Sequence, residues 1–471
     1  MNRHRAALTA ALLALLLGLA ADLLLRYIPW GLNAFLWTLL AVVAAATVAR
    51  RRERAEGAPP LQLAFPAACA LVASACLVWR DSPRLEALDI FMLLIFLPML
   101  AAGARGVRLA NAGLTELAGS SVTTGLQAAA GFPQLVLSDL TWQAPRGGTL
   151  RTGGVVFRGV VIALPALLLF GALLASADAA FAKLISDLIT FDLKAAIQHL
   201  VVTAIVAAIC AGFLRSLLFS GAMPRVSRPD FLALGAAETN IAIGLINLLF
   251  ATFVGVQFRY FFGGAHLVRV GNLTWSEYAR RGFFELVWVV TLTLPMLLAA
   301  EWLIRKDDAR GLRTFRILAV VQIALVFIIA VSAYQRMQLY RDAYGLTEDR
   351  FYTTAFMCWL GALLVWFIAT VLTGHRGRFA IGVLASGVLA VVTLHAINPD
   401  ALIVRTNLAR TQRPFDDKYV VTLSDDAAEV ILSNPSRFAP ETLAKYEQRP
   451  RPFGWRTWNA SRARALELLR R

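Results

Sequence analysis

The sequence has few charged residues and few cysteines, and each scarcity excludes a class of protein. Only 16% of the 471 residues are charged, whereas 58% are hydrophobic and the mean hydropathy is +0.63. Soluble globular domains carry about 25% charged residues, so a water-soluble fold is excluded. The four cysteines form no C-x-x-C motif and no Cys/His cluster, which excludes the usual zinc-finger and redox patterns.

Signature motifs of catalysis and cofactor binding are also missing. The chain contains no G-x-S-x-G, H-E-x-x-H or P-loop pattern. The glycines of GGTLRTGG (147–154) match no phosphate-binding loop. The five histidines are dispersed, and no pair has metal-ligand spacing. We therefore expect no cofactor and no metal site.

Long apolar runs are what the chain has in abundance. Each is roughly 17–23 residues long, enough to cross a hydrocarbon core about 30 Å thick. We predict an all-α fold, a polytopic transmembrane helix bundle of about eleven spans with a small extramembrane C-terminal tail. The expected spans are 6–25, 31–49, 63–79, 86–104, 155–175, 197–219, 235–257, 282–304, 315–335, 352–373 and 380–397.

The expected spans divide the chain into four parts. These are a four-helix membrane segment (1–104), a cytoplasmic loop (105–154), a seven-helix membrane core (155–397) and the extramembrane tail (398–471). Lys and Arg are more frequent in loops on the side of the N-terminus, which favours a cytoplasmic N-terminus and an outer tail. The first run is longer than the apolar part of a usual signal peptide, so we expect a retained helix.

The basic residues also bear on partners and source. The formal net charge is +16, but the charges lie at the ends of apolar runs and form no domain-sized patch, so we expect no nucleic-acid partner. The bilayer is the expected partner, and a protein could bind the tail or the 105–154 loop. The strong excess of Arg over Lys suggests a GC-rich bacterial genome, and hence a bacterial inner membrane.

One polar stretch, LTWSEYARRGFFELVWVV (273–290), stands where a membrane span begins. Thr274 and Glu277 fit a capping box, which predicts a helix that starts outside the bilayer. Arg281 lies four residues after Glu277 and four before Glu285, so it can pair with either acid. The simpler interpretation of this stretch is therefore a capped, charge-paired anchor.

The neighbouring outer loops add further arginines and tyrosines. Arginine forks suit carboxylate and phosphate groups, so a small anionic ligand or a lipid headgroup at the outer face is the sharper hypothesis. Alternatively, the same arginines pair with acids of the tail. The candidate ligand-binding residues are Arg259, Tyr260, Tyr278, Arg280, Arg281, Glu285, Arg336, Tyr340 and Tyr344.

The span expected at 235–257 carries polar residues inside the membrane. Asn240 and Asn247 share a face with small residues, and Glu238 lies near the inner end. Such stripes usually make helix–helix contacts. Intramembrane polar groups also mark substrate paths, so both interpretations stay open.

Several of these stretches resemble a group of bacterial multi-pass proteins, the domain of unknown function 4173 with its relative 4153. The resemblance rests on NLLFATFVGVQFRYFFGG (247–264), LTWSEYARRGFFEL (273–286), RMQLYRDAYGLTEDR (336–350) and NPDALIVRTNLAR (398–410). It covers roughly residues 155–471, and the YARRGFFEL block is its most specific part. The resemblance implies an inner-membrane location and assigns no activity and no catalytic residue.

Three functions stay open from the sequence. The first is binding or transport of a small anionic or lipid-linked ligand at the outer face, with arginines converging on one cavity. The second is a non-catalytic sensory or assembly component with a docked tail. The third is a membrane-embedded transferase acting on a lipid-linked substrate, for which Asp22 is the outer-face acid considered.

Overall fold

The computed structural model describes residues 3–56, 61–105, 112–140, 193–220, 234–262, 283–305, 308–410 and 415–471, with isolated positions between 159 and 183. These residues form helices, and the bridge between Leu234 and Ile304 is isolated and makes no strand. Helices satisfy every internal backbone donor and acceptor within one segment, which an apolar solvent requires. The prediction of an all-α bundle is confirmed.

Nine helices in the described part of the chain are long and apolar enough to cross a membrane, and a tenth has a shorter apolar stretch, Leu63–Trp79. They overlap ten of the eleven predicted spans. The remaining prediction, 155–175, lies largely outside the described residues. The ten helices are α1 (Arg3–Leu25), α2 (Leu32–Glu56), α3 (Leu61–Trp79), α4 (Pro83–Ala104), α8 (Leu193–Phe219), α9 (Ala236–Phe262), α12 (Phe283–Leu303), α13 (Ala309–Tyr344), α14 (Glu348–Thr370) and α15 (Arg376–Ile397).

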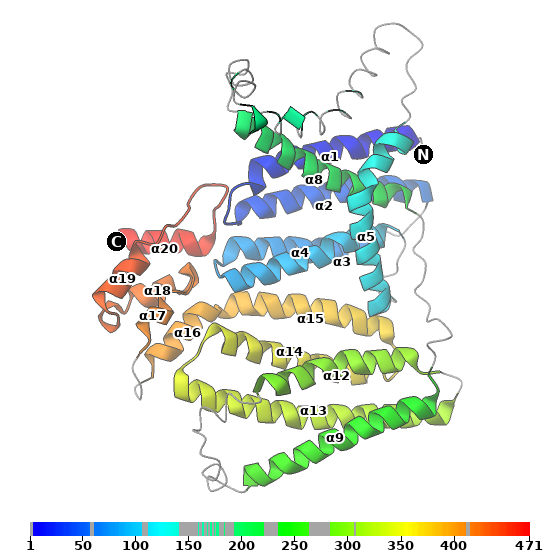
Figure 1. Cartoon of the computed structure of the whole chain (residues 1–471), viewed down its shortest axis with the longest axis vertical. Helices are drawn as coiled ribbons and strands as arrows, with labels where there is room; N and C mark the ends of the chain where they lie inside the picture. Colours follow the sequence, from blue (N-terminus) through cyan, green and yellow to red (C-terminus); the bar gives the residue numbers. More distant parts are fainter. Residues whose placement is uncertain are drawn as a thin grey trace.

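The segment 105–154, which was expected to be a loop, contains helix α5 (Leu114–Gln134) and the turn Leu135–Asp139 that continues it. Its serines and threonines suggested a loop, but the buried hydroxyls of Ser120 and Thr124 donate to backbone carbonyls of the preceding turn. A hydroxyl satisfied in this way is tolerated inside a helix. Helix α5 runs across the direction of the long helices and packs on α4 and α8 (Figure 1).

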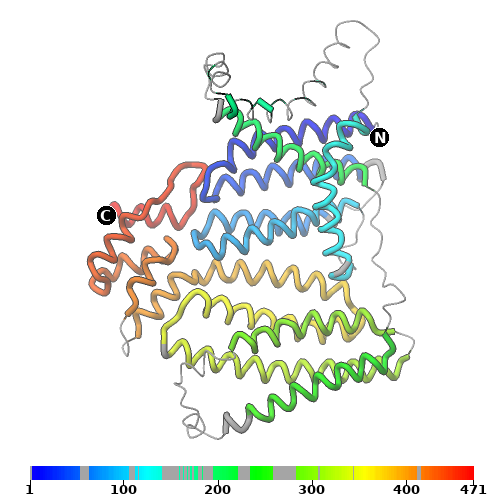
Figure 2. Tube along the Cα trace, viewed as in Figure 1, coloured from blue at the N-terminus to red at the C-terminus, as the bar shows by residue number. Residues whose placement is uncertain are grey.

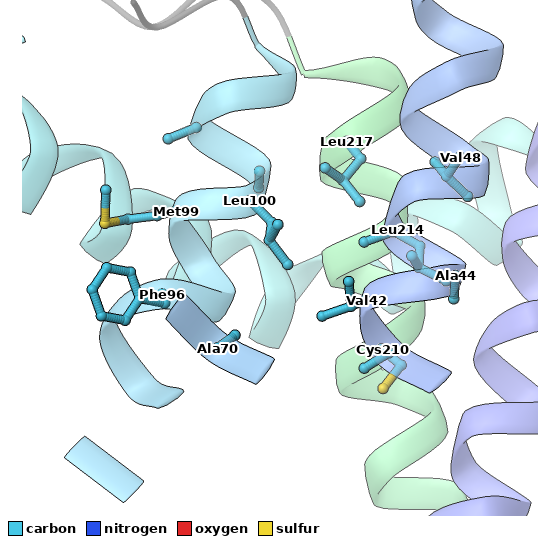
Figure 3. Close-up of a cluster of buried hydrophobic side chains, with 14 of the residues drawn as sticks. Val42, Ala44, Val48, Ala70, Phe96, Met99, Leu100, Cys210, Leu214 and Leu217 are labelled. Carbon is cyan, nitrogen blue, oxygen red and sulfur yellow. The ribbon is translucent and has the colours of Figure 1, made fainter. Parts of the chain in front are cut away.

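Two apolar cores hold the spans together. The first joins α1, α2, α3, α4 and α8, and Figure 3 shows some of its side chains, among them Phe96, Leu100 and Leu214. The second joins α9, α12, α13 and α14, and α15 contributes to both cores. Helix α8 therefore packs with the N-terminal helices, which differs from the predicted division at residue 155.

The C-terminal residues 398–410 and 415–471, called the cap from here on, lie at one end of the bundle, opposite the N-terminus (Figures 1 and 2). Leu346, from the turn between α13 and α14, joins the apolar core of the cap, so the cap and the bundle share buried surface. The helices of the cap are α16 (Pro399–Leu408), α17 (Asp417–Val420), α18 (Ala428–Leu432), α19 (Pro440–Glu447) and α20 (Ala460–Arg470).

Glycine permits the close contact of α5 with α8, and this gives a test of the packing. A Cβ on Gly212 would lie 2.1 Å from the carbonyl oxygen of Ala128, whereas a Cβ on Gly255 of α9 would meet nothing within 4 Å. We expect Gly212→Ala to destabilise the protein by about 1–3 kcal/mol through overpacking. Gly255→Ala should be neutral or stabilising, because alanine favours helix more than glycine does. Equal thermal melting curves for the two variants in detergent would contradict this packing.

Candidate functional site beneath the C-terminal cap

The start of α4 is capped by a residue from the other end of the sequence. Asp426 of the cap accepts hydrogen bonds from the backbone amides of Asp81 and Ser82, each at 3.0 Å. Ser82 is the N-cap residue of α4, and its own side chain makes no capping bond. A carboxylate at this position is stabilised by the orphan amides and by the positive end of the helix dipole. The cap is thus attached to the backbone immediately before a membrane span.

A second joint involves the carboxyl end of α3. The buried side chain of Asn459 donates to the carbonyls of Leu77 (2.9 Å) and Arg80 (2.7 Å), which the helix itself leaves without partners. Its oxygen accepts from the amides of Ser461 and Arg462 and so starts α20. One amide side chain therefore ends a span and begins a cap helix.

Arg462 forms the third joint and is almost fully buried. Its Nη2 donates to the carbonyl of Trp30, in the turn between α1 and α2, at 3.1 Å. Its Nε lies 2.7 Å from Oδ1 of Asp81, and Nη1 donates to the carbonyl of Thr457 at 3.0 Å. A single guanidinium thus links the turn between α1 and α2 and the turn between α3 and α4 with the cap.

Beneath these joints lies a buried histidine–aspartate pair. Nδ1 of His395 lies 2.9 Å from the carbonyl of Val391, and because a carbonyl only accepts, Nδ1 carries the proton. Nε2 of His395 lies 3.1 Å from Oδ2 of Asp89, and both residues are at most 1% exposed. Asp89 is about two turns below the capped start of α4. His395 is three residues before Asn398, where the cap begins.

The same place holds a candidate metal-ligating group. Cys76 of α3 completes a trio in which the ligand atoms of Cys76, Asp89 and His395 all lie within 4.8 Å of one another. Oδ1 of Asp89 is buried and has no hydrogen-bond partner within the described part of the chain. No metal site was expected from sequence, because these three residues come from three helices and show no ligand spacing along the chain.

Two carboxyl groups at the cap interface have raised pKa values. Burial raises the pKa of Asp81 to about 6, against the lowering effect of Arg462, while Asp425 and Asp426 raise it further. Burial likewise raises the pKa of Asp400 to about 6, although hydrogen bonds from Ser424 lower it. Both groups therefore bind protons more tightly in the folded protein than in the unfolded chain.

This difference sets a pH dependence. A carboxyl whose folded pKa is above its unfolded value makes the folded state take up protons, so stability should rise as the pH falls through about 6 and the rise should end near the unfolded value of 3.8. We expect melting temperatures in detergent to increase from pH 8 to pH 5, with a smaller increase in Asp400→Asn. An increase of equal size in wild type and variant would show that Asp400 does not contribute to the pH dependence of stability.

Several predicted ligand-binding residues lie outside the described part of the chain. Residues 263–282 are not described, so the capping box at Thr274–Glu277 and the candidates Tyr278, Arg280 and Arg281 lie outside it. The side chains described for α9 end at Gln257, so Arg259 and Tyr260 are placed only as helical residues. Glu285 is described and is exposed in the first turn of α12.

The candidates on α13 lie in its last turns. The guanidinium of Arg350 stacks over the ring of Tyr340 at 4.1 Å and lies 5.9 Å from that of Tyr344. The two tyrosine rings are 4.9 Å apart in an edge-to-face arrangement. Arg336 lies one turn before Tyr340 on the same helix. The structure thus brings the tyrosines together around an arginine that was not among the chosen candidates.

The polar residues of α9 bind the neighbouring helix. The side-chain amides of Asn240 and Asn247 each donate at 2.9 Å to a carbonyl of α13, those of Gly311 and Leu318. Glu238 accepts from the amide of Gly235 at the start of its own helix. These contacts are the ones that the helix-packing interpretation requires.

Comparison with known proteins finds one family. The family model described as "Domain of unknown function (DUF4153)" matches residues 67–434, which include most of α3, the spans α4 and α15 and the cap residue Asp426. The related group 4173, which the sequence resemblance favoured, is not shown. No curated protein and no solved structure matches the chain.

Proposed function

This chain belongs to the DUF4153 family, and we propose that it is a non-catalytic sensory or assembly component of a membrane. In this proposal the cap and the spans α3, α4 and α15 work as one responsive unit. The observation that carries it is the hydrogen bonding of Asp426 to the backbone amides of Asp81 and Ser82, the two residues directly before α4. A displacement of the cap removes that capping interaction, and a change at Asp89 or His395 acts on the helices that hold the cap.

The orientation proposed with this function puts the cap on the outer side. The end of the bundle opposite the cap carries basic residues on several helices, among them Arg51 and Arg52 of α2, Arg310 of α13 and Arg376 of α15. An excess of Lys and Arg marks the cytoplasmic side. We therefore place the N-terminus in the cytoplasm of a bacterium and the cap outside its inner membrane.

Proteolysis of the purified protein in lipid nanodiscs tests the responsive unit. Asp426→Asn removes one charge from the joint and should speed tryptic cleavage within residues 398–471 at least tenfold, a change of about 1.4 kcal/mol in docking. Glu441→Gln changes an exposed acid of α19 and should leave the rate unchanged. A cap cut equally slowly in both variants would show that Asp426 does not hold it.

A sensory component also requires that the protection of the cap from proteolysis changes with the conditions. The cleavage rate should change at least threefold across a panel of pH values from 8 to 5, divalent ions and anionic lipids. A rate that stays constant over the whole panel would make the cap a static part of the fold and overturn the proposal.

A second candidate function remains an anionic or lipid-linked ligand at the outer face. Helix α13 has 36 residues, or about 54 Å, which exceeds the hydrocarbon thickness of about 30 Å. In this second proposal its last turns, with Arg336, Tyr340 and Tyr344, project beyond the bilayer. Anionic lipids, polyprenyl phosphates and small organic anions should raise the melting temperature if they bind. That shift should be lost in Arg280→Gln/Arg281→Gln and kept in Arg316→Gln, at the opposite end of α13.

A further inference from the structure

We propose that Cys76, Asp89 and His395 bind one divalent transition-metal ion of the zinc class at the junction of α3, α4 and α15. The ligand atoms are Sγ of the cysteine, a carboxylate oxygen of the aspartate and Nε2 of the histidine. As the ligand of the responsive unit, the ion rests on the proposed function above, but its binding is measured independently of the cap.

The distances fit a tetrahedral site with a small adjustment. With Zn–N and Zn–O bonds of about 2.0 Å, a tetrahedral centre holds its nitrogen and oxygen ligands about 3.3 Å apart. Nε2 of His395 and Oδ2 of Asp89 are 3.1 Å apart. The sulfur of Cys76 lies within 4.8 Å of both, against about 3.5 Å in such a centre. A rotamer change of one side chain can close a gap of this size.

The histidine is held in the tautomer that a metal needs. Its Nδ1–H donates to the carbonyl of Val391, which leaves Nε2 directed at Asp89. Metal-binding histidines usually donate their second ring N–H to a carbonyl or carboxylate, because this fixes the ring and raises the basicity of the ligating nitrogen. Here the supporting carbonyl comes from the same helix, one turn earlier.

Charge balance favours a divalent ion in this surrounding. A thiolate and a carboxylate together carry two negative charges, and the neutral imidazole adds none, so a divalent ion makes the buried group neutral. Cys76, Asp89 and His395 are each at most 4% exposed, where an uncompensated charge is costly. Oδ1 of Asp89 has no hydrogen-bond partner among the residues that the structure describes, so coordination also satisfies a buried oxygen that these residues leave unpaired.

Sulfur and nitrogen ligands select the kind of ion. Magnesium and calcium prefer sets of oxygen ligands, whereas mixed thiolate, imidazole and carboxylate sets suit zinc and its neighbours in the first transition row. Three protein ligands leave the fourth tetrahedral position open for water or another small donor. The site therefore resembles an exchangeable one more than a closed structural one.

Cobalt titration of the purified full-length protein in detergent tests the proposal. Co²⁺ should bind at one ion per chain, with the visible bands of a tetrahedral centre and a thiolate charge-transfer band in the near ultraviolet, and Zn²⁺ should displace it. Cys76→Ser should abolish the charge-transfer band and weaken binding at least tenfold. Cys210→Ser is the matched control, because Cys210 is also buried in a span but lies outside the trio.

Two results would overturn the site. One is a folded wild-type protein that gives no charge-transfer band, and the other is a band that persists in Cys76→Ser. If Cys76→Ser does not fold, X-ray absorption of the zinc-loaded wild type decides, because the site requires one sulfur at about 2.3 Å with nitrogen and oxygen at about 2.0 Å. Zinc that binds without changing the proteolysis of the cap would support the site but contradict the role of the ion as the ligand of the responsive unit.

Discussion

Asp89→Ala should be among the most damaging single substitutions in this protein, with a loss of about 3–5 kcal/mol of stability. The substitution leaves the buried Nε2 of His395 without its hydrogen-bond partner. It also opens a cavity where α3, α4 and α15 meet. Thermal and chemical unfolding of the variant in detergent, compared with wild type at one pH, measures the loss.

A double-mutant cycle separates the pair from the cavity. Asp89→Ala and His395→Ala should each be costly, but the double variant should cost far less than the sum, because neither partner is then left buried alone. Asp349→Ala provides the control for an exposed pair, since Asp349 and its partner Arg84 are both well exposed, and it should cost at most about 1 kcal/mol. Additive losses at Asp89 and His395 would mean that the two side chains are not coupled.

Arg462→Met should release the cap while leaving the spans folded. The substitution keeps much of the apolar stem but removes the guanidinium that pairs with Asp81 and donates to the carbonyl of Trp30. Removing one partner of a buried ion pair typically costs about 3–5 kcal/mol, because the other charge stays buried and unpaired. We expect rapid proteolysis within residues 398–471 and an intact membrane fragment.

Arg464→Met is the matched control on the same helix. Arg464 is half exposed and pairs only with Glu467 in the described contacts, so its loss should change cap proteolysis by less than about 1 kcal/mol in free energy. Similar proteolysis of the Arg462 and Arg464 variants would show that the cap is held by apolar contacts alone.

The membrane spans were predictable from sequence because apolar runs of sufficient length have few alternatives in a bilayer. Helix α5 was not predicted, because its serines and threonines are typical of loops and their hydroxyl bonds to the preceding turn are invisible in composition. The side-by-side packing of α8 with α1 also depends on tertiary contacts, such as the close approach of Gly18 to Ala207.

The candidate site was largely missed for a related reason. Asp89 and His395 both fell within predicted spans, and a charged residue in a span is a functional candidate by default, so this signal was present in the sequence. Their pairing joins residues 306 positions apart, which no local pattern reveals. In the sequence, nothing distinguishes Asp426 from the other acidic residues of the tail. Its hydrogen bonds to the backbone amides before α4 follow only from the fold.

Hydrogen exchange of the protein in nanodiscs tests the central claim, that the cap and the start of α4 form one unit. The amides of Asp81 and Ser82 and those of α16–α20 should exchange slowly in wild type. In Asp426→Asn they should speed up together, whereas the amides of α9 should keep their rates. Faster exchange in the cap alone, with α4 unchanged, would contradict the claim and leave the cap as an independent appendage.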